Sequence, residues 1–140
     1  MGCGPENPAG LGMRFRIDGD RATTQLTLDR RHEGAPGFAH GGALAAALDD
    51  LLGTVLIILE RPAVTASLTV DYRKPALLHR PYELEAWCDR IEGRKLYLAG
   101  TIKDGDTLLA EARALFLQVD LGHFERSGEP LPAAWESWGR

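Results

Sequence analysis

The chain has 140 residues, which suits one domain of ordinary size, and its hydrophobic content of 44% is enough for a packed core. A formal net charge of −4 argues against nucleic acid as the main partner, although a local basic patch could still bind phosphates. The two cysteines, Cys3 and Cys88, have neither metal-binding nor redox spacing, so we expect free thiols in a reducing compartment, the cytoplasm.

The first part of the chain predicts irregular structure followed by a β-hairpin. Residues 1–12 are rich in glycine and proline and are expected to form an irregular leader without the apolar core of a signal peptide. Strands are expected over residues 13–17 and 22–30, joined by a turn at Gly-Asp-Arg. The stretch EGAPGF (33–38) then breaks the chain.

Residues 40–59 predict one long helix that ends before Arg61-Pro62. It is apolar, but Asp49 and Asp50 lie near its middle, and each would cost roughly 2.5–3.5 kcal/mol at the centre of a bilayer. We therefore expect a core helix and no membrane span. At about 100° per residue, one apolar face is expected to contain Leu44, Leu48, Leu51, Val55 and Leu59.

Four strands are expected after the helix, over residues 64–73, 82–91, 94–104 and 107–120. In the first of them apolar and polar residues alternate, which is typical of a strand with one buried face. This alternation places Thr65 on the more polar face.

The order of these elements predicts an α+β fold, in which an antiparallel sheet wraps around one long central helix. We expect a single domain over residues 1–140, with an irregular C-terminal tail at 121–140 in which Trp135 and Trp138 are candidate anchors. A dimer would cover the surfaces that this arrangement leaves open.

His40, Gly41 and Gly42 open the predicted helix. The first N–H groups of a helix have no intrahelical partner and lie at the positive end of its dipole. Two glycines at this end let an oxygen approach closely, which favours an oxyanion hole. A capping histidine with two turn glycines would give the same pattern without any such role.

The aspartates could be solvated surface groups, or one of them could be a catalytic base. Gly41 and Asp49 are separated by about 12 Å along a helix. A base and an oxyanion donor must both lie about 3 Å from the reacting group. The two residues could therefore act on one carbonyl only if they came from different subunits, with the two helices antiparallel across a two-fold axis.

Three stretches resemble a known family when they are taken together: GFAHGGALAAALDD (37–50), TASLTVDYRKPALL (65–78) and EGRKLYLAGTIKDGDTLLAEARALF (92–116). They are similar to the hotdog-fold acyl-CoA thioesterases, and especially to the PaaI-like branch and the mitochondrial long-chain acyl-CoA thioesterases. The resemblance covers about residues 30–120. It implies the hotdog fold, a homodimer or a dimer of dimers, and hydrolysis of an acyl-CoA to a carboxylic acid and CoA.

The resemblance also implies roles for individual residues. It distinguishes Asp49 from Asp50 as the catalytic carboxylate, acting as general base or as a nucleophile that forms an anhydride. The backbone N–H of Gly41 would polarise the thioester carbonyl, His40 would shape that turn, and Thr65 would help to hold the attacking water.

Other positions are candidates for substrate binding. The resemblance places Arg73 and Lys74 near the CoA phosphates, although a solvated strand end would look the same in the sequence; Arg94 and Gly42 are further candidates. It implies no metal ion, and no cofactor apart from the CoA of the substrate. A dimer that binds acyl-CoA without turnover, or a hotdog hydratase, remains an alternative, and the acyl group is not indicated.

Overall fold

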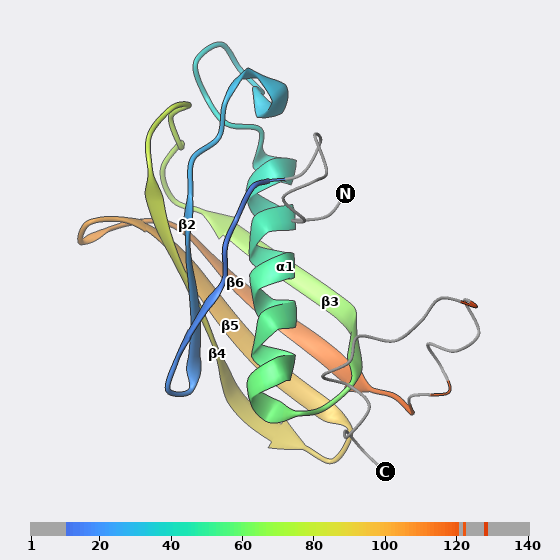
Figure 1. Cartoon of the computed structure of the whole chain (residues 1–140). Helices are drawn as coiled ribbons and strands as arrows, with labels where there is room; N and C mark the ends of the chain where they lie inside the picture. The colour runs from blue at the N-terminus through green and yellow to red at the C-terminus, as the bar shows by residue number, and fades with distance from the viewer. Residues whose placement is uncertain (1–10, 121, 123–127, 129–140) are drawn as a thin grey trace.

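The computed structural model describes residues 11–120, 122 and 128. A six-stranded antiparallel sheet of order β1-β2-β4-β5-β6-β3 curves around one long helix, α1, as Figure 1 shows. The elements are β1 (Arg16–Asp18), β2 (Arg21–Leu26), the 3₁₀ helix η1 (Arg30–His32), α1 (Gly41–Leu59), β3 (Ala63–Tyr72), β4 (Tyr82–Glu92), β5 (Lys95–Asp104) and β6 (Thr107–Gln118). This arrangement confirms the predicted α+β architecture.

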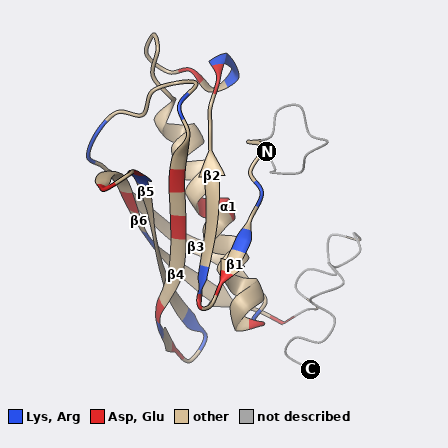
Figure 2. Cartoon of the chain, turned by 60° about the vertical axis from the view of Figure 1, so that its left-hand side comes forward, with Lys and Arg blue, Asp and Glu red and all other residues tan. Residues whose placement is uncertain are grey.

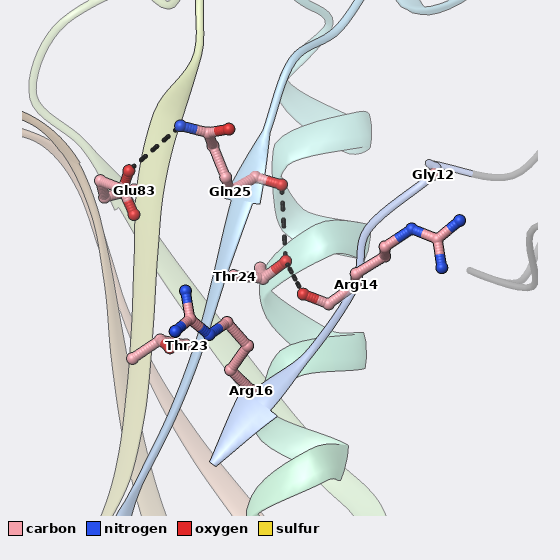
Figure 3. Close-up of a pocket in the computed structure, with 7 residues that line it drawn as sticks. All are labelled: Gly12, Arg14, Arg16, Thr23, Thr24, Gln25 and Glu83. Carbon is pink, nitrogen blue, oxygen red and sulfur yellow. Dashed lines mark hydrogen bonds between the residues drawn. The ribbon is translucent and has the colours of Figure 1, made fainter. Parts of the chain in front are cut away.

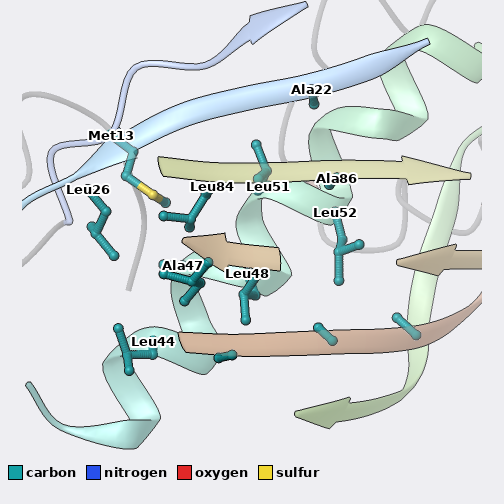
Figure 4. Close-up of a cluster of buried hydrophobic side chains, with 14 of the residues drawn as sticks. Met13, Ala22, Leu26, Leu44, Ala47, Leu48, Leu51, Leu52, Leu84 and Ala86 are labelled. Carbon is teal, nitrogen blue, oxygen red and sulfur yellow. The ribbon is translucent and has the colours of Figure 1, made fainter. Parts of the chain in front are cut away.

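The core lies between α1 and the sheet, where leucines of the helix meet leucines and alanines of the strands (Figure 4). Of the predicted apolar face, the first four residues are buried and Leu59, the last residue of the helix, is partly buried. Burying one such side chain contributes about 1.5–3 kcal/mol. A Cβ at Gly100 of β5 would lie 3.4 Å from Cδ2 of Leu48, in ordinary van der Waals contact, so this glycine packs directly against the helix.

The composition of α1 follows from its place in this core. The helix is long and apolar enough to cross a bilayer, with a mean hydropathy of 1.9, but half of that stretch is buried inside the fold. A helix that packs along a sheet passes the same test. It ends as predicted: Glu60 adopts the left-handed conformation with φ 53°, and its N–H donates to the C=O of Ile57 and Leu56.

The N-terminal strands are shorter than the sequence predicts. The strand expected over 13–17 is β1 only from Arg16, and the one expected over 22–30 ends at Leu26. The chain then turns into η1, which the sequence analysis did not predict. Asp29 caps this turn by accepting a hydrogen bond from the N–H of Arg31. Such local side-chain bonds compete with a strand ladder.

Some expectations fall partly or wholly outside the described residues. Most of the leader, almost all of the C-terminal tail with its two tryptophans, and Cys3 lie there. Cys88 is a partly buried free thiol, and burial raises its pKa.

A β-bulge in β3 changes which residues face the helix. The pairing of β3 with β6 shifts after Thr65 and leaves Ala66 as an extra, unpaired residue. Thr65 is paired with Phe116, and Leu68 with Ala114. Directly paired residues of antiparallel strands lie on the same face of the sheet, and both β6 partners are buried. Thr65 therefore lies on the helix-facing side, not on the opposite face as the alternation predicts, because a bulge reverses the pattern by one residue.

Candidate functional site

The start of α1 is shaped by a histidine cap. His40 is the N-cap residue, and its Nδ1 accepts a hydrogen bond from the N–H of Gly42 at 2.8 Å. A Cβ at Gly42 would lie only 2.9 Å from that Nδ1. The second glycine of the His-Gly-Gly sequence is therefore required by the cap itself, since any larger residue would push the imidazole away.

The N–H of Gly41 is left open by the bonds around it. The C=O of His40 accepts hydrogen bonds from Ala43 at 3.0 Å and Leu44 at 3.3 Å. The C=O of Gly41 accepts from the Tyr72 hydroxyl at 2.7 Å. Among the described residues, no acceptor is found for the Gly41 N–H. This N–H can therefore donate to an oxygen of a ligand, as an oxyanion hole requires.

An open hollow of about 310 Å³ lies beside Gly41. Its walls are mostly apolar, with two cationic residues among them. The lining residues are Ala39, Gly41, Leu44, Tyr72, Arg73, Lys74, Pro75 and Ala76. Tyr72 is not among the site residues predicted from the sequence, although its place directly before Arg73-Lys74-Pro75 was the available signal.

Asp49 and Thr65 form a second group, in the middle of α1. The Thr65 hydroxyl donates to Oδ1 of Asp49 at 2.9 Å. Asp49 is partly buried and Thr65 is exposed, so the pair is open to water. The bulge at Ala66 makes this contact possible, because it turns Thr65 towards the helix. The pair joins a carboxylate with a hydroxyl, which together can hold and deprotonate a water molecule.

The two groups do not meet within one chain. Gly41 and Asp49 are about 12 Å apart along α1. Thr65 and Tyr72 are paired with residues six positions apart on β6, which is about 20 Å at roughly 3.3 Å per residue. β3 is the last strand of the sheet, so within the part of the chain that the structure describes no strand pairs with its other edge. Two halves of a site thus lie along the same unpaired edge.

Arg73 and Lys74 lie at the end of β3, and the N–H groups of both donate to the C=O of Leu109, at 2.7 and 3.0 Å. The Arg73 guanidinium is paired with Glu111 at 2.5 Å, which raises the pKa of Arg73 and lowers that of Glu111. For Lys74 no ion pair is found among the described side chains. Lys74 can therefore bind an anion directly, whereas Arg73 must share its charge with Glu111.

Arg94 lies far from this hollow in the same chain. Arg94 comes directly before the first residue of β5, and its Nε donates to the C=O of Gln118 at 3.1 Å. The residues of β5 beside Leu109 are about eight positions further on, which is about 26 Å at roughly 3.3 Å per residue. The structure thus does not bring Arg94 to the hollow, or to Arg73 and Lys74, within one chain.

A second hollow, of about 340 Å³, lies at the β1–β2 edge (Figure 3). It is lined by Gly12, Arg14, Arg16, Thr23, Thr24, Gln25 and Glu83. β2 runs here between acidic residues of β4 and basic residues of β1, as Figure 2 shows. No residue that the sequence predicts for the site lines this hollow. Within the described chain, no three His, Cys, Asp or Glu side chains are grouped to hold a metal ion.

Comparison with known proteins identifies relatives of this chain. Mouse acyl-coenzyme A thioesterase THEM4 is 43% identical over 117 residues, which cover 79% of this chain and 50% of that protein. The chain therefore spans about half the length of this curated relative.

Solved structures share the fold. The crystal structure of a thioesterase superfamily protein superposes with a TM-score of 0.77 at 29% identity, covering 81% of this chain and 60% of that one. A hypothetical thioesterase of Streptococcus pneumoniae TIGR4, solved with coenzyme A, has a TM-score of 0.71 at 18% identity, covering 76% and 85%. The sequence model of the thioesterase superfamily matches residues 36–117, which include both halves of the site. The chain belongs to this superfamily, with its hotdog fold.

Proposed function

We propose that this chain hydrolyses acyl-CoA thioesters to a carboxylic acid and CoA. The observation that carries the proposal is the 2.9 Å hydrogen bond from Thr65 to Asp49. Asp49 lies on the same helix as Gly41, whose N–H is open. The name of the mouse relative supports the substrate class, since it is an acyl-coenzyme A thioesterase.

The chemistry needs a base, a water molecule and an oxyanion donor. The Thr65 hydroxyl donates to one oxygen of Asp49, and the other carboxylate oxygen is available to accept a proton from water. The water oxygen forms a bond to the thioester carbon, the carbonyl oxygen gains negative charge, and the Gly41 N–H stabilises it. The C–S bond then breaks, and the thiolate takes up a proton as CoA leaves. Direct attack by Asp49, with hydrolysis of the resulting anhydride, gives the same products.

We propose that each site is shared between two chains. Asp49 and Gly41 are about 12 Å apart along α1, so they cannot both reach one carbonyl from the same chain. In a two-fold dimer with antiparallel helices, Asp49 of one chain would lie beside Gly41 of the partner subunit. The unpaired edge of β3 supports this arrangement, because a second β3 could continue the sheet there.

We propose that the CoA phosphates bind near the hollow at the end of β3. Lys74 and Arg73 line it and carry the positive charge that phosphates need.

The Streptococcus pneumoniae protein is known with coenzyme A, and also as an aspartate-to-alanine and a threonine-to-alanine variant. The two variant positions are sixteen residues apart there, and Asp49 and Thr65 have the same separation.

The test is a panel of acyl-CoAs with short, long and aromatic acyl groups, followed by release of the CoA thiol. We expect turnover of at least one class by the wild-type protein, with CoA and free acid in equal amounts. Binding of acyl-CoA without thiol release above that of Asp49→Asn would contradict hydrolysis and indicate a binding protein.

A further inference from the structure

Tyr72 contacts the proposed oxyanion donor without a role in the chemistry described so far. Its hydroxyl donates to the C=O of Gly41 at 2.7 Å. Its ring covers the Gly41 backbone, since a Cβ there would lie 3.4 Å from both Cζ and the hydroxyl oxygen of Tyr72. Tyr72 is 50% exposed and lines the hollow. It therefore lies where it can act on Gly41 from the side that faces a ligand.

The peptide group that joins Gly41 to Gly42 is held at both ends. Its C=O accepts the hydrogen bond from Tyr72, and its N–H donates to Nδ1 of His40 at 2.8 Å. The preceding peptide is held through its C=O, which accepts from Ala43 and Leu44. Of the four polar groups in these two peptides, only the Gly41 N–H lacks a partner among the described residues.

These two hydrogen bonds matter because the peptide joins two glycines, Gly41 and Gly42. Glycine has the widest choice of backbone conformations, so an N–H on glycine points in a defined direction only if its neighbours are fixed. An oxyanion donor is effective when it is already aimed before the charge develops. The His40 cap holds the N–H of this peptide, and Tyr72 adds a hydrogen bond to its C=O, which also belongs to the first residue of the α1 ladder.

We propose that Tyr72 is a positioning residue. It holds the peptide group between Gly41 and Gly42, so that the N–H of Gly41 points at the thioester oxygen. The proposal rests on the proposed function, since it assumes that this N–H stabilises an oxyanion. Burial raises the pKa of the Tyr72 phenol, so the hydroxyl stays protonated and able to donate at neutral pH.

The first experiment compares Tyr72→Phe with Tyr97→Phe. Tyr97 lies on the other face of the sheet, beneath the guanidinium of Arg90, and its hydroxyl is remote from the site. We expect Tyr72→Phe to lower kcat about tenfold with KM within about twofold, because loss of an oxyanion donor itself costs about 10²–10³-fold. Tyr97→Phe should retain wild-type kcat. Equal kcat for wild type and Tyr72→Phe would overturn the proposal.

A double variant separates positioning from direct contact with substrate. Tyr72 and His40 act on the same peptide, so their effects should not be additive. Once His40→Ala has released one end, removal of the Tyr72 hydroxyl should cost about twofold instead of tenfold. Two losses in kcat that multiply fully would show that Tyr72 acts directly on substrate, and would overturn positioning.

Amide NMR provides a readout that does not depend on turnover. We expect Tyr72→Phe to shift the Gly41 and Gly42 amide resonances and to increase the hydrogen exchange of the Gly42 N–H, while Tyr97→Phe leaves both unchanged. An inactive wild-type protein with this NMR response would refute the proposed function and keep the positioning contact. An active wild-type protein whose Gly41 and Gly42 amides do not respond would refute the positioning role alone.

Discussion

The two halves of the site are built in different ways. At the start of α1, backbone hydrogen bonds and the His40 cap fix the peptides around Gly41. In the middle of α1, a single side-chain hydrogen bond joins Asp49 to Thr65, and it depends on a bulge in a neighbouring strand. Several hydrogen bonds hold the first half, which suits an oxyanion donor because such a donor must be aimed in advance. The second half is open to water, as a base that activates water must be.

The largest expected effect separates the two neighbouring aspartates. Asp49→Asn removes the base while keeping its shape, so we expect kcat to fall about 10²–10⁴-fold, with the far-UV circular dichroism spectrum unchanged. Asp50→Asn is the matched control, one residue further along α1, and should retain most of the activity. Similar losses in kcat from both substitutions would refute the assignment of Asp49.

A smaller effect is expected from the Thr65 hydroxyl. Thr65→Val keeps the side-chain shape and removes the donor to Asp49, so we expect kcat to fall about tenfold, which corresponds to one hydrogen bond of about 1.4 kcal/mol. Thr69→Val is the control, because Thr69 is paired with Arg113 on the opposite face of the same strand. If the two variants had the same kcat, the Thr65–Asp49 contact would have no catalytic role.

Substrate recognition should depend on the end of β3. Replacing Arg73 and Lys74 with alanine should raise KM for acyl-CoA about fivefold and weaken its salt dependence, with less change for a short thioester that lacks the nucleotide. The double variant of Lys103 and Arg113 removes the same charge from the outer face of the sheet and should leave KM unchanged. An equal rise in KM from both pairs would indicate general attraction of the anion instead of a phosphate site.

The smallest effect concerns stability and two glycines of α1. Gly53→Ala meets nothing within 4 Å and should raise the free energy of unfolding by about 0.5–1 kcal/mol, since alanine is the better helix former. Gly42→Ala displaces the His40 cap and should lower it by about 1 kcal/mol. Urea unfolding measures both. A stabilising Gly42→Ala would show that the cap is not needed.

The sequence predicts the start of α1 correctly but does not predict the contact of Thr65 with Asp49. The His40–Gly41–Gly42 start, the length of α1 and its apolar face depend on local propensity and periodicity, and the structure confirms that helix. The contact of Thr65 with Asp49 depends on one extra residue, Ala66, in the pairing of β3 with β6. No residue type marks that bulge, so the alternation predicted the wrong face.

Two other features of the site also lie beyond local patterns. The place of Tyr72 over Gly41 joins residues that are 31 positions apart in the chain. The pairing of Arg73 with Glu111 and the distance of Arg94 from the hollow are set by strand register across β6 and β5. A sequence pattern identifies such residues as candidates but cannot place them relative to one another.

The central claim is that each site takes Gly41 and Asp49 from different chains, and complementation between two inactive variants tests it most directly. Asp49→Asn lacks the base. Gly41→Pro lacks the backbone donor, and proline is tolerated in the first turn of a helix. His40 is already extended, with φ −65° and ψ 133°, as a residue before proline must be. Each homodimer should therefore be folded and nearly inactive.

The two variants are then refolded together, and mixed dimers are counted by native mass spectrometry. Random pairing makes about half of the dimers mixed, and a shared site gives each mixed dimer one intact site of two. We therefore predict about a quarter of the wild-type activity. If mixed dimers form and the activity stays at the level of the homodimers, each site draws both groups from one chain and the shared site is contradicted.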